Sequence, residues 1–320
     1  MAELILFEAP DLLPAAWRDW TARGPVRVFN PGLLADGLDW VFAYRAVGPD
    51  GARRIGICRL DRGLRVVPGS QAALSDEIAN GADALPGPVA ARNWFADPRL
   101  YRMGSRIFVH WNTGWHEPQN HQFLQELGPS DLRPIGAPRE LDLATERNSL
   151  EKNWTLFGEG PVYAVYRPNP HRILSVPLDG EGKIRCVEIA STPWDVAGYE
   201  SSFGELRGGA PPQLVSGQYY SICHSVCGTP GDYRYVAAAY RFSARAPFRP
   251  SGAPAGALGL PHPFAGRRIH GKLNPAVGAV TYPCGAVFRE GHWHVSYGIN
   301  DEHCAIAVMP HASIEAAIRP

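Results

Sequence analysis

The sequence predicts an all-β fold, and in particular a single five-bladed β-propeller over residues 1–320 with a site in its central funnel. Three observations lead to this prediction. The chain contains 34 Gly and 30 Pro among its 320 residues, and they separate short apolar segments. Helical periodicity is hard to find in these segments, and one strand-like pattern recurs along the chain. Short apolar strands punctuated by Gly and Pro are typical of all-β folds.

The recurring pattern is a strand of alternating or aromatic residues that ends in one or two polar groups. Its five occurrences are WVFAYRA at 40–46, RIFVHWN at 106–112, VYAVYRP at 162–168, YYSICHS at 219–225 and HWHVSYGIND at 292–301. They lie about sixty residues apart, which is the scale of a propeller blade with its loops. The alternative interpretation is that any antiparallel β-protein contains aromatic strands of this kind.

In a propeller, the innermost strand of each blade lines the axis, so residues distant in sequence converge there. We therefore expect the strand-ending residues to meet in the funnel; they are Arg45, His110, Arg167, His224 and Asp301. Charged and polar groups arranged around a funnel suit a ligand with many hydroxyls better than an apolar one.

Two stretches read as long loops, near residues 112–150 and 244–275, because Pro-rich or Gly-rich turns fill them. The first contains one short helix near Gln122–Leu127. Long loops in a compact domain are often lids over a site. At the carboxyl end, SIEAAI at 313–318 predicts a short helix with Ser313 as its N-cap.

The charge balance argues against two classes of partner. Lys plus Arg number 31 and Asp plus Glu number 31, so the formal net charge is zero. A dedicated nucleic-acid or membrane-surface binder normally carries a basic excess. No apolar run approaches the roughly 20 residues needed to cross a bilayer. We expect no nucleic-acid partner and no membrane span.

The first residues do not resemble a secretory signal, because they carry acids early and lack a long apolar run after a basic start. The cysteines are scattered through apolar stretches, which favours buried free thiols. They are Cys58, Cys186, Cys223, Cys227, Cys284 and Cys304. Together these features predict a soluble, cytoplasmic protein.

Several familiar catalytic motifs are absent from the sequence: GxSxG, the P-loop, GxGxxG and paired CxxC. His110, His116 and His121 cluster, and His292 and His294 share a strand face. Neither set has a carboxylate or Cys partner in a recognised metal-ligand spacing. We expect neither a metal nor an organic cofactor.

Seven polar segments have unusual local composition: VFNPG (28–32), FADPR (95–99), EKNW (151–154), GELRGGAPP (204–212), CHSV (223–226), YPCGAV (282–287) and YGIND (297–301). Together and in this order they resemble the β-mannoside phosphorylases and hydrolases of glycoside hydrolase family 130 and related five-bladed-propeller glycosyltransferases. The resemblance runs from about Arg27 to Met309. It implies an enzyme that binds an oligosaccharide or a sugar phosphate in the funnel.

The resemblance implies a catalytic role for Asp97, which matches the family's general acid. An inverting cleavage needs a protonated acid to assist the leaving oxygen and a nucleophile on the opposite face. The alternative interpretation of Asp97 is a turn aspartate before Pro98 that forms a salt bridge with Arg99. The implied sugar-binding residues are Asn30, Arg45, Arg99, Glu205 and Asp301.

Each of these sugar contacts has a structural alternative. Asn30 is also a good turn former before Pro31-Gly32, and Asp301 could be a solvated hairpin aspartate. Glu205 could lie on the surface. These alternatives stay open at the level of sequence.

For the phosphate or donor site, the resemblance implies His224, Arg167 and Lys152. Phosphate binding requires several cationic donors converging on one anion. The EKNW segment departs from the phosphorylase pattern, and the cationic set is incomplete. Three functions therefore remain: an inverting glycosidase or glycoside phosphorylase acting on β-mannoside-like oligosaccharides, a glycosyltransferase of the same fold that uses an activated sugar, and a non-catalytic carbohydrate-binding propeller.

Overall fold

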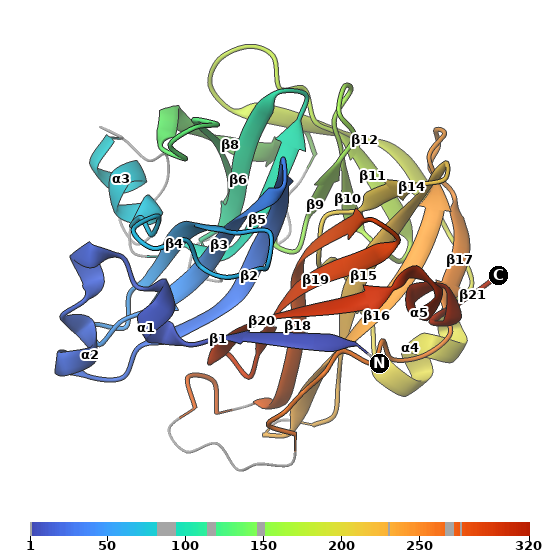
Figure 1. Ribbon diagram of the computed structural model, residues 1–320. Coiled ribbons are helices and arrows are strands. Elements are labelled where there is room, and N and C mark those ends of the chain that lie inside the picture. The colour runs from blue at the N-terminus through green and yellow to red at the C-terminus, as the bar shows by residue number, and fades with distance from the viewer. Residues whose placement is uncertain are drawn as a thin grey trace.

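The computed structural model describes residues 2–81, 94–113, 120–145, 151–229, 231–265, 272–275 and 277–320. The predicted all-β fold is confirmed, because the described strands form three sheets (Figure 1). The helices are short and peripheral. They are α1 (Ala9–Leu12), a 3₁₀ turn (Ala15–Trp17), α2 (Trp20–Arg23), α3 (Leu74–Gly81), α4 (Ala197–Phe203) and α5 (His311–Ala316).

The first half of the chain forms antiparallel groups of consecutive strands. The first group is a separate sheet of β2 (Arg27–Asp36), β3 (Asp39–Val47) and β4 (Arg53–Leu60). The second is β5 (Ala96–Met103), β6 (Arg106–Asn112), β7 (Gln122–Leu127) and β8 (Pro134–Leu143). The third is β9 (Thr155–Phe157), β10 (Tyr163–Arg167), β11 (His171–Ser175) and β12 (Ile184–Thr192). A short parallel pairing of β8 with β12 joins the second and third groups into one sheet.

The second half repeats this organisation. One group contains β13 (Leu206–Arg207), β14 (Gln213–Val215), β15 (Gln218–Cys227), β16 (Tyr233–Ser243) and β17 (Pro250–Pro254). The last contains β18 (Val277–Arg289), β19 (His292–Ile299) and β20 (His303–Pro310), and the amino-terminal β1 (Glu3–Phe7) pairs with β20 (Figure 1). A parallel β16–β18 pairing joins the two groups, and β21 (Ile318–Arg319) pairs with β17. The two ends of the chain are thus tied into one sheet.

Glycines allow the leading segments of the groups to approach one another closely. A Cβ on Gly32 of β2 would lie 2.8 Å from the carbonyl oxygen of Pro98 on β5. Gly208, just after β13, packs in the same way against the backbone of Asn153, and Gly285 of β18 packs against Leu33 of β2. The first strand of each group therefore lies at the common centre.

This arrangement corrects which strands line the centre. The five segments predicted as strands are strands, and they form the cores of β3, β6, β10, β15 and β19. Each pairs with the strand or strands of its group nearest the centre, so it is second in the hydrogen-bonded order of the strands and reaches the centre only with its end. His110 shows the consequence. It is fully buried within its sheet, shares a hydrogen bond of 2.7 Å with Gln122, and does not line the central cavities.

The long loop predicted near 112–150 is also corrected. Gln122–Leu127 is strand β7 rather than a helix, because β6 and β8 pair with both of its edges and Phe123 and Leu127 are buried. β8 occupies much of the remainder. In the second predicted loop, near 244–275, β17 is a strand and most of the other described residues are irregular.

The terminal helix begins earlier than predicted. α5 starts at His311, after an extended Pro310, so Ser313 lies inside the helix and is not its N-cap. Ile318 belongs to β21. The prediction of free thiols is confirmed, since none of the six cysteines forms a disulfide and five are buried. Within the described ranges, no helix is long and apolar enough to cross a membrane.

Candidate active site

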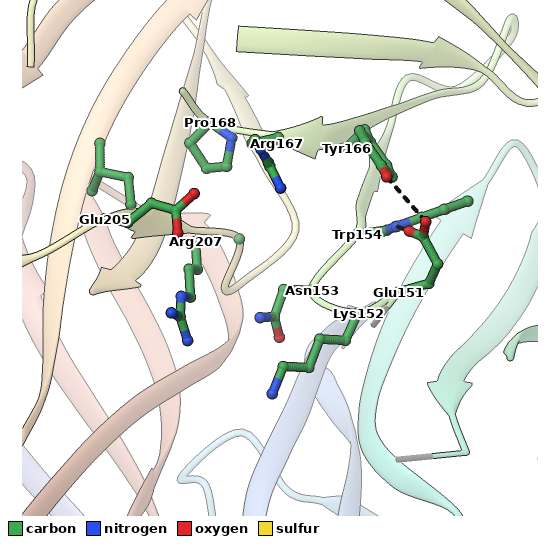
Figure 2. A pocket seen from close by; sticks show the side chains of 11 residues that line it. Glu151, Lys152, Asn153, Trp154, Tyr166, Arg167, Pro168, Glu205 and Arg207 are labelled. Carbon is green, nitrogen blue, oxygen red and sulfur yellow. Dashed lines mark hydrogen bonds between the residues drawn. The ribbon is translucent and has the colours of Figure 1, made fainter. Parts of the chain in front are cut away.

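Two adjoining cavities open where the leading strands meet. The larger, of about 390 Å³, is called the funnel cavity, and the smaller, of about 280 Å³, the side cavity (Figure 2). They share Lys152, Asn153 and Arg207. The other polar and aromatic residues of the funnel cavity are Asn30, Arg45, Arg53, Trp94, Asp97, Asn112, His224, Tyr235, Asn274, Tyr282 and Asp301.

One end of the funnel cavity is built on two bulges of similar sequence. The register of β2 shifts between Phe29 and Gly32, and that of β5 shifts between Ala96 and Arg99. The bulged residues are Asn30 and Asp97, and each precedes a proline, which cannot donate to a sheet ladder. Asn30 Nδ2 donates a hydrogen bond of 2.8 Å to Asp97 Oδ1. The two bulges thus place an amide and a carboxylate side by side.

Arg45 forms an ion pair with the same carboxylate oxygen, with 3.3 Å between Arg45 Nη1 and Asp97 Oδ1. The arginine that the sequence suggested as the partner, Arg99, bonds instead to the backbone carbonyl of Asp97. Asp97 therefore lines the cavity, and its carboxylate is held by two side-chain donors, Asn30 and Arg45. An ordinary turn aspartate would not have such partners.

Backbone strain gathers at this cavity. Asn30, Asp97, Asn153 and Asp301 all have left-handed backbone conformations, with φ of 52°, 54°, 66° and 57°. Such conformations cost roughly 1–3 kcal/mol each in non-glycine residues and cluster at functional sites, although Asn and Asp tolerate them best. The surrounding structure holds these four side chains in place against that cost.

Arg99 lies behind the cavity instead of lining it. It is fully buried and donates to the carbonyl oxygen of Gly209 at 2.6 Å and to the hydroxyl of Tyr282 at 3.1 Å. That hydroxyl in turn donates to Asn153 Oδ1 at 2.6 Å. Arg99 therefore links three leading segments and orients two residues, Tyr282 and Asn153, that do line the cavity.

A further part of the funnel lining carries the cations Lys152 and Arg207 and is called the cationic wall. His224 lies there as well, and no ion pair within 4.0 Å joins Lys152 or Arg207 to a carboxylate among the described residues. Sequence reasoning missed Arg207, although its segment, GELRGGAPP, was one of the seven singled out. β13 contributes only two residues, and Arg207 is one of them. With Arg207 present, the cationic set is larger than the sequence indicated.

His224 is neutral at physiological pH. Burial and the positive charges of Arg207 and Lys152 hold its pKa well below the ordinary value. The side chain is 1% exposed, and its Nδ1 has no hydrogen-bond partner among the described residues. A buried polar atom without a partner is costly, so this nitrogen points to a ligand.

The segment that carries Lys152 and Asn153 is held from behind (Figure 2). The buried carboxylate of Glu151 accepts hydrogen bonds from Trp154 Nε1 at 3.2 Å and from the Tyr166 hydroxyl at 3.0 Å. The side chain of Asn120 bonds to both the N–H and the carbonyl of Glu151. These bonds fix the backbone from which Lys152 and Asn153 reach the cavity.

The two carboxylates of the funnel cavity differ in protonation. Burial would raise the pKa of Asp97, but Arg45, Arg99, the hydrogen bond from Asn30 and Lys152 outweigh it and lower the pKa. Burial raises the pKa of Asp301 to about 6, and the charge of Asp97 adds to this while Arg45 opposes it. Asp97 is therefore ionised in the unliganded funnel, whereas Asp301 titrates near neutrality.

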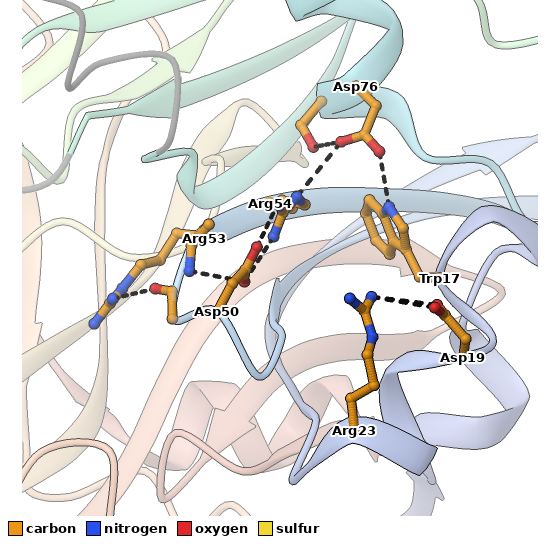
Figure 3. A network of polar contacts seen from close by, with 10 residues as sticks. Trp17, Asp19, Arg23, Asp50, Arg53, Arg54 and Asp76 are labelled. Carbon is orange, nitrogen blue, oxygen red and sulfur yellow. Dashed lines mark hydrogen bonds and ion pairs between the residues drawn. The ribbon is translucent and has the colours of Figure 1, made fainter.

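Aromatic rings complete the walls. The guanidinium of Arg53 lies 3.9 Å from the centre of the Trp94 ring, and Tyr235 stacks on His224 with 5.7 Å between ring centres. The next residue along β4, Arg54, points the other way and pairs with Asp50 and Asp76 (Figure 3). This outer network fixes the start of β4 and so the position of Arg53.

The structure separates the residues proposed from the sequence into three places. Asn30, Arg45, Asp97, Lys152, His224 and Asp301 line the funnel cavity. Arg167 and Glu205 are exposed and line the side cavity, which Lys152 also lines. Arg99 lines neither.

The histidines considered as metal ligands have other partners or positions. His121 Nδ1 forms a hydrogen bond of 2.5 Å with Glu140 Oε1, and His116 lies outside the described residues. Among the residues that the structure describes, no group of three or more His, Cys, Asp or Glu side chains could hold a metal ion.

No family model matches this chain, and no curated protein matches it in sequence. Solved structures match it over most of its length. A β-1,2-mannobiose phosphorylase from Listeria innocua, in complex with β-1,2-mannobiose, is 15% identical over 98% of each chain, with a TM-score of 0.62. A glycosyl hydrolase from Bacteroides ovatus is 14% identical over 89% of this chain and 85% of its own, with a TM-score of 0.61.

A third structure comes from work on the GH130 family of mannoside phosphorylases, which contains glycoside hydrolases that target β-1,2-mannosidic linkages in Candida mannan. It is 13% identical over 89% of this chain and 85% of its own, with a TM-score of 0.58. These similarities establish the fold. They confirm, at the level of the fold, the resemblance drawn from the seven sequence segments.

Proposed function

We propose that this chain is an inverting glycoside phosphorylase that cleaves β-mannoside-like oligosaccharides in the funnel cavity, with inorganic phosphate as the nucleophile. The observation that carries the proposal is that Lys152, Arg207 and the neutral His224 line the same cavity as the carboxylate of Asp97. Structural neighbours described as mannoside phosphorylases and hydrolases support the substrate class.

The cationic wall favours phosphorolysis over hydrolysis. An inverting hydrolase needs a carboxylate base that activates water on the face opposite the acid. Phosphate is already a nucleophilic anion and needs cationic donors instead. Lys152 and Arg207 supply positive charge, and the orphaned Nδ1 of His224 can donate a hydrogen bond to a phosphate oxygen in the tautomer that carries its proton there.

Sugar hydroxyls find their partners at the other end of the funnel cavity. Asn30, Arg45 and Asp301 offer an amide, a guanidinium and a carboxyl group. Trp94 and Tyr235 offer aromatic surface, which packs against the apolar C–H faces of a sugar ring. We propose that the sugar to be transferred binds beside these residues, between Asp97 and the cationic wall.

Asp97 is proposed as the general acid, and anion binding supplies the condition for it. In the unliganded funnel, positive charge holds Asp97 ionised. A phosphate dianion bound at the cationic wall offsets part of that charge and raises the pKa of Asp97. Binding of the nucleophile and protonation of the acid are thus linked, so that the acid becomes competent when both substrates are present.

The reaction follows from these positions. A phosphate oxygen approaches the anomeric carbon from the cationic wall and forms a new C–O bond. The glycosidic C–O bond breaks on the opposite side, and the leaving oxygen takes up the proton that Asp97 supplies, directly or through a sugar hydroxyl. The single displacement inverts the configuration, so a β-mannoside yields α-mannose 1-phosphate.

The fold is part of the same proposal. We interpret the five antiparallel groups as the blades of a five-bladed propeller in one domain of 320 residues, closed by the pairing of β1 with β20. The close packing of β2 with β5 and with β18, and of Gly208 with Asn153, supports a ring of leading strands. The cytoplasmic location expected from the sequence also belongs to the proposal.

The proposal is tested in the direction of synthesis. The native protein, Asp97→Asn and Arg207→Gln are each incubated with α-mannose 1-phosphate and a panel of acceptor sugars, and phosphate release is measured. We expect release by the native protein, at least a hundredfold loss in Asp97→Asn, and a raised KM for the sugar phosphate in Arg207→Gln. Absence of release together with consumption of a sugar nucleotide would instead identify a glycosyltransferase.

A further inference from the structure

The side cavity extends the anion site in one direction only. It meets the funnel cavity at Lys152, Asn153 and Arg207, which are residues of the cationic wall and its neighbour. Asp97, Asn30 and Asp301 do not line it. A ligand that reaches from the transferred sugar into the side cavity must therefore pass the position proposed for phosphate.

A third cation, Arg167, lines the side cavity but not the funnel cavity. Arg167 ends β10, and Figure 2 shows its side chain directed into the space above Asn153. No ion pair within 4.0 Å joins Arg167 to a carboxylate among the described residues. Lys152, Arg207 and Arg167 thus all line the side cavity, and the first two also line the funnel cavity.

Two carboxylates, Glu151 and Glu205, line the side cavity beside these three cations, so its lining keeps a formal excess of one positive charge. Glu151 is buried, and its two oxygens accept hydrogen bonds from Trp154 and Tyr166. Glu205 is exposed and, among the described residues, has no ion pair within 4.0 Å. Two of the three cations, Lys152 and Arg207, also face the funnel, so positive charge dominates where the two cavities join.

We infer that the side cavity binds a second anionic group joined to the phosphate of the funnel, so that the site accepts a diphosphate. This inference rests on the proposed phosphate position. The diphosphate has two sources: inorganic pyrophosphate, or the diphosphate of an activated sugar such as a sugar nucleotide. In either case the first phosphate lies against Lys152, Arg207 and His224, and the second lies against Arg167.

Isothermal titration calorimetry of the full chain tests the inference. Orthophosphate and pyrophosphate are titrated into the native protein, Arg167→Gln and Arg185→Gln at equal ionic strength. Arg185 is the control, because it is an exposed arginine on β12 that lines neither cavity. Pyrophosphate carries more charge than orthophosphate and gains affinity from any basic surface, so the decisive quantity is the ratio of the two dissociation constants.

We expect the native protein to bind pyrophosphate about tenfold or more tightly than orthophosphate. Arg167→Gln should lose most of that ratio and change orthophosphate affinity about twofold or less, whereas Arg185→Gln should retain the ratio. A ratio near one in the native protein, or a ratio unchanged in Arg167→Gln, overturns the inference. So does an Arg167→Gln effect confined to neutral mannooligosaccharides, which would make the side cavity a saccharide subsite.

Competition then separates the two sources. A mannose-bearing sugar nucleotide that displaces pyrophosphate at lower concentration than mannose 1-phosphate, and depends on Arg167, identifies the activated sugar. Displacement by pyrophosphate alone identifies the inorganic ion, and both outcomes support the site. Failure of the native protein to bind orthophosphate at all would count against the proposed function itself, and it is distinguished from failure of the second anion site by the orthophosphate titration alone.

Discussion

Asn30 Nδ2 donates a hydrogen bond of 2.8 Å to Asp97 Oδ1, although 67 residues separate the two positions in the chain. Each residue occupies a bulge before a proline and has a left-handed backbone. The bond joins the leading strands of two sheets in the lining of the funnel cavity. It also fixes the carboxylate on which the proposed chemistry depends.

Gly298 is required for this bond. A Cβ at position 298 would overlap Asn30 Oδ1 and approach the Asn30 backbone nitrogen to 2.8 Å. We expect Gly298→Ala to destabilise the protein by about 1–3 kcal/mol, because backbone and side chain must both shift. Denaturant unfolding measures this, with Gly256→Ala as the control, since a Cβ added at position 256 would meet nothing within 4 Å. Equal stability of the two variants contradicts the prediction.

Asp301 makes stability depend on pH. Its pKa of about 6 exceeds the ordinary value of 3.8, so the folded state binds this proton more tightly than the unfolded chain does. The associated stability is present at low pH and is lost as the pH rises through about 6. Asp301→Asn should therefore raise the unfolding free energy by roughly 1–3 kcal/mol at about pH 8.

The same substitution should give little gain at about pH 4, where most of Asp301 is protonated in the native protein as well. Thermal or denaturant unfolding at the two pH values measures the difference. Glu205→Gln, which removes an exposed carboxylate of the side cavity, is measured beside it as the matched variant. An equal gain at both pH values would mean that Asp301 does not titrate as described.

The link between anion binding and Asp97 predicts proton uptake. Sulfate remains a dianion across the neutral range, so any proton taken up on its binding goes to the protein. We expect native protein to take up a fraction of a proton at about pH 6 when sulfate binds, because the anion offsets the charge of Arg45 and Lys152 beside Asp97. Calorimetry in buffers of different ionisation enthalpy measures the uptake.

In Asp97→Asn this uptake should fall, leaving only the part due to the nearby Asp301. Uptake of the same size in both proteins would place the proton elsewhere in the funnel. Asp301→Asn completes the comparison, because it should retain the part of the uptake that belongs to Asp97.

Glu151 is expected to be a positioning residue. Glu151→Ala leaves the buried donors of Trp154 and Tyr166 without partners, and we expect a loss of about 2–4 kcal/mol in stability. The segment with Lys152 and Asn153 should loosen, so the KM for phosphate should rise more than kcat falls. Glu151→Gln, which keeps an acceptor for one donor, should recover part of both losses. A fall in kcat with an unchanged KM for phosphate would argue for a different role of Glu151.

The fold was predictable because its second strands carry clear patterns. WVFAYRA and YYSICHS alternate and are aromatic, and each became the middle of a well-paired strand. The strands nearest the centre do not show this alternating, aromatic pattern. β2 and β5 are interrupted by Asn-Pro and Asp-Pro bulges, and β9 and β13 have three and two residues. Strand periodicity cannot be detected over so short a length.

The site was predictable only where the segments resembled a known family. Arg207 was missed, because its strand is too short to assign and its role depends on Lys152 and His224, which belong to other segments of the chain. The place of Arg99 could not be foreseen either. Its main partner is the carbonyl oxygen of Gly209, 110 residues further along the chain.

Phosphate held by the cationic wall is the proposed nucleophile, and its part in the reaction can be measured directly. Cleavage of a β-1,2-linked mannooligosaccharide is followed with and without inorganic phosphate, by phosphorus and proton NMR. We expect α-mannose 1-phosphate only when phosphate is present, no free mannose from the cleaved bond, and no product from Asp97→Asn. Release of mannose at the same rate without phosphate would contradict the proposed mechanism and assign the chain to hydrolysis.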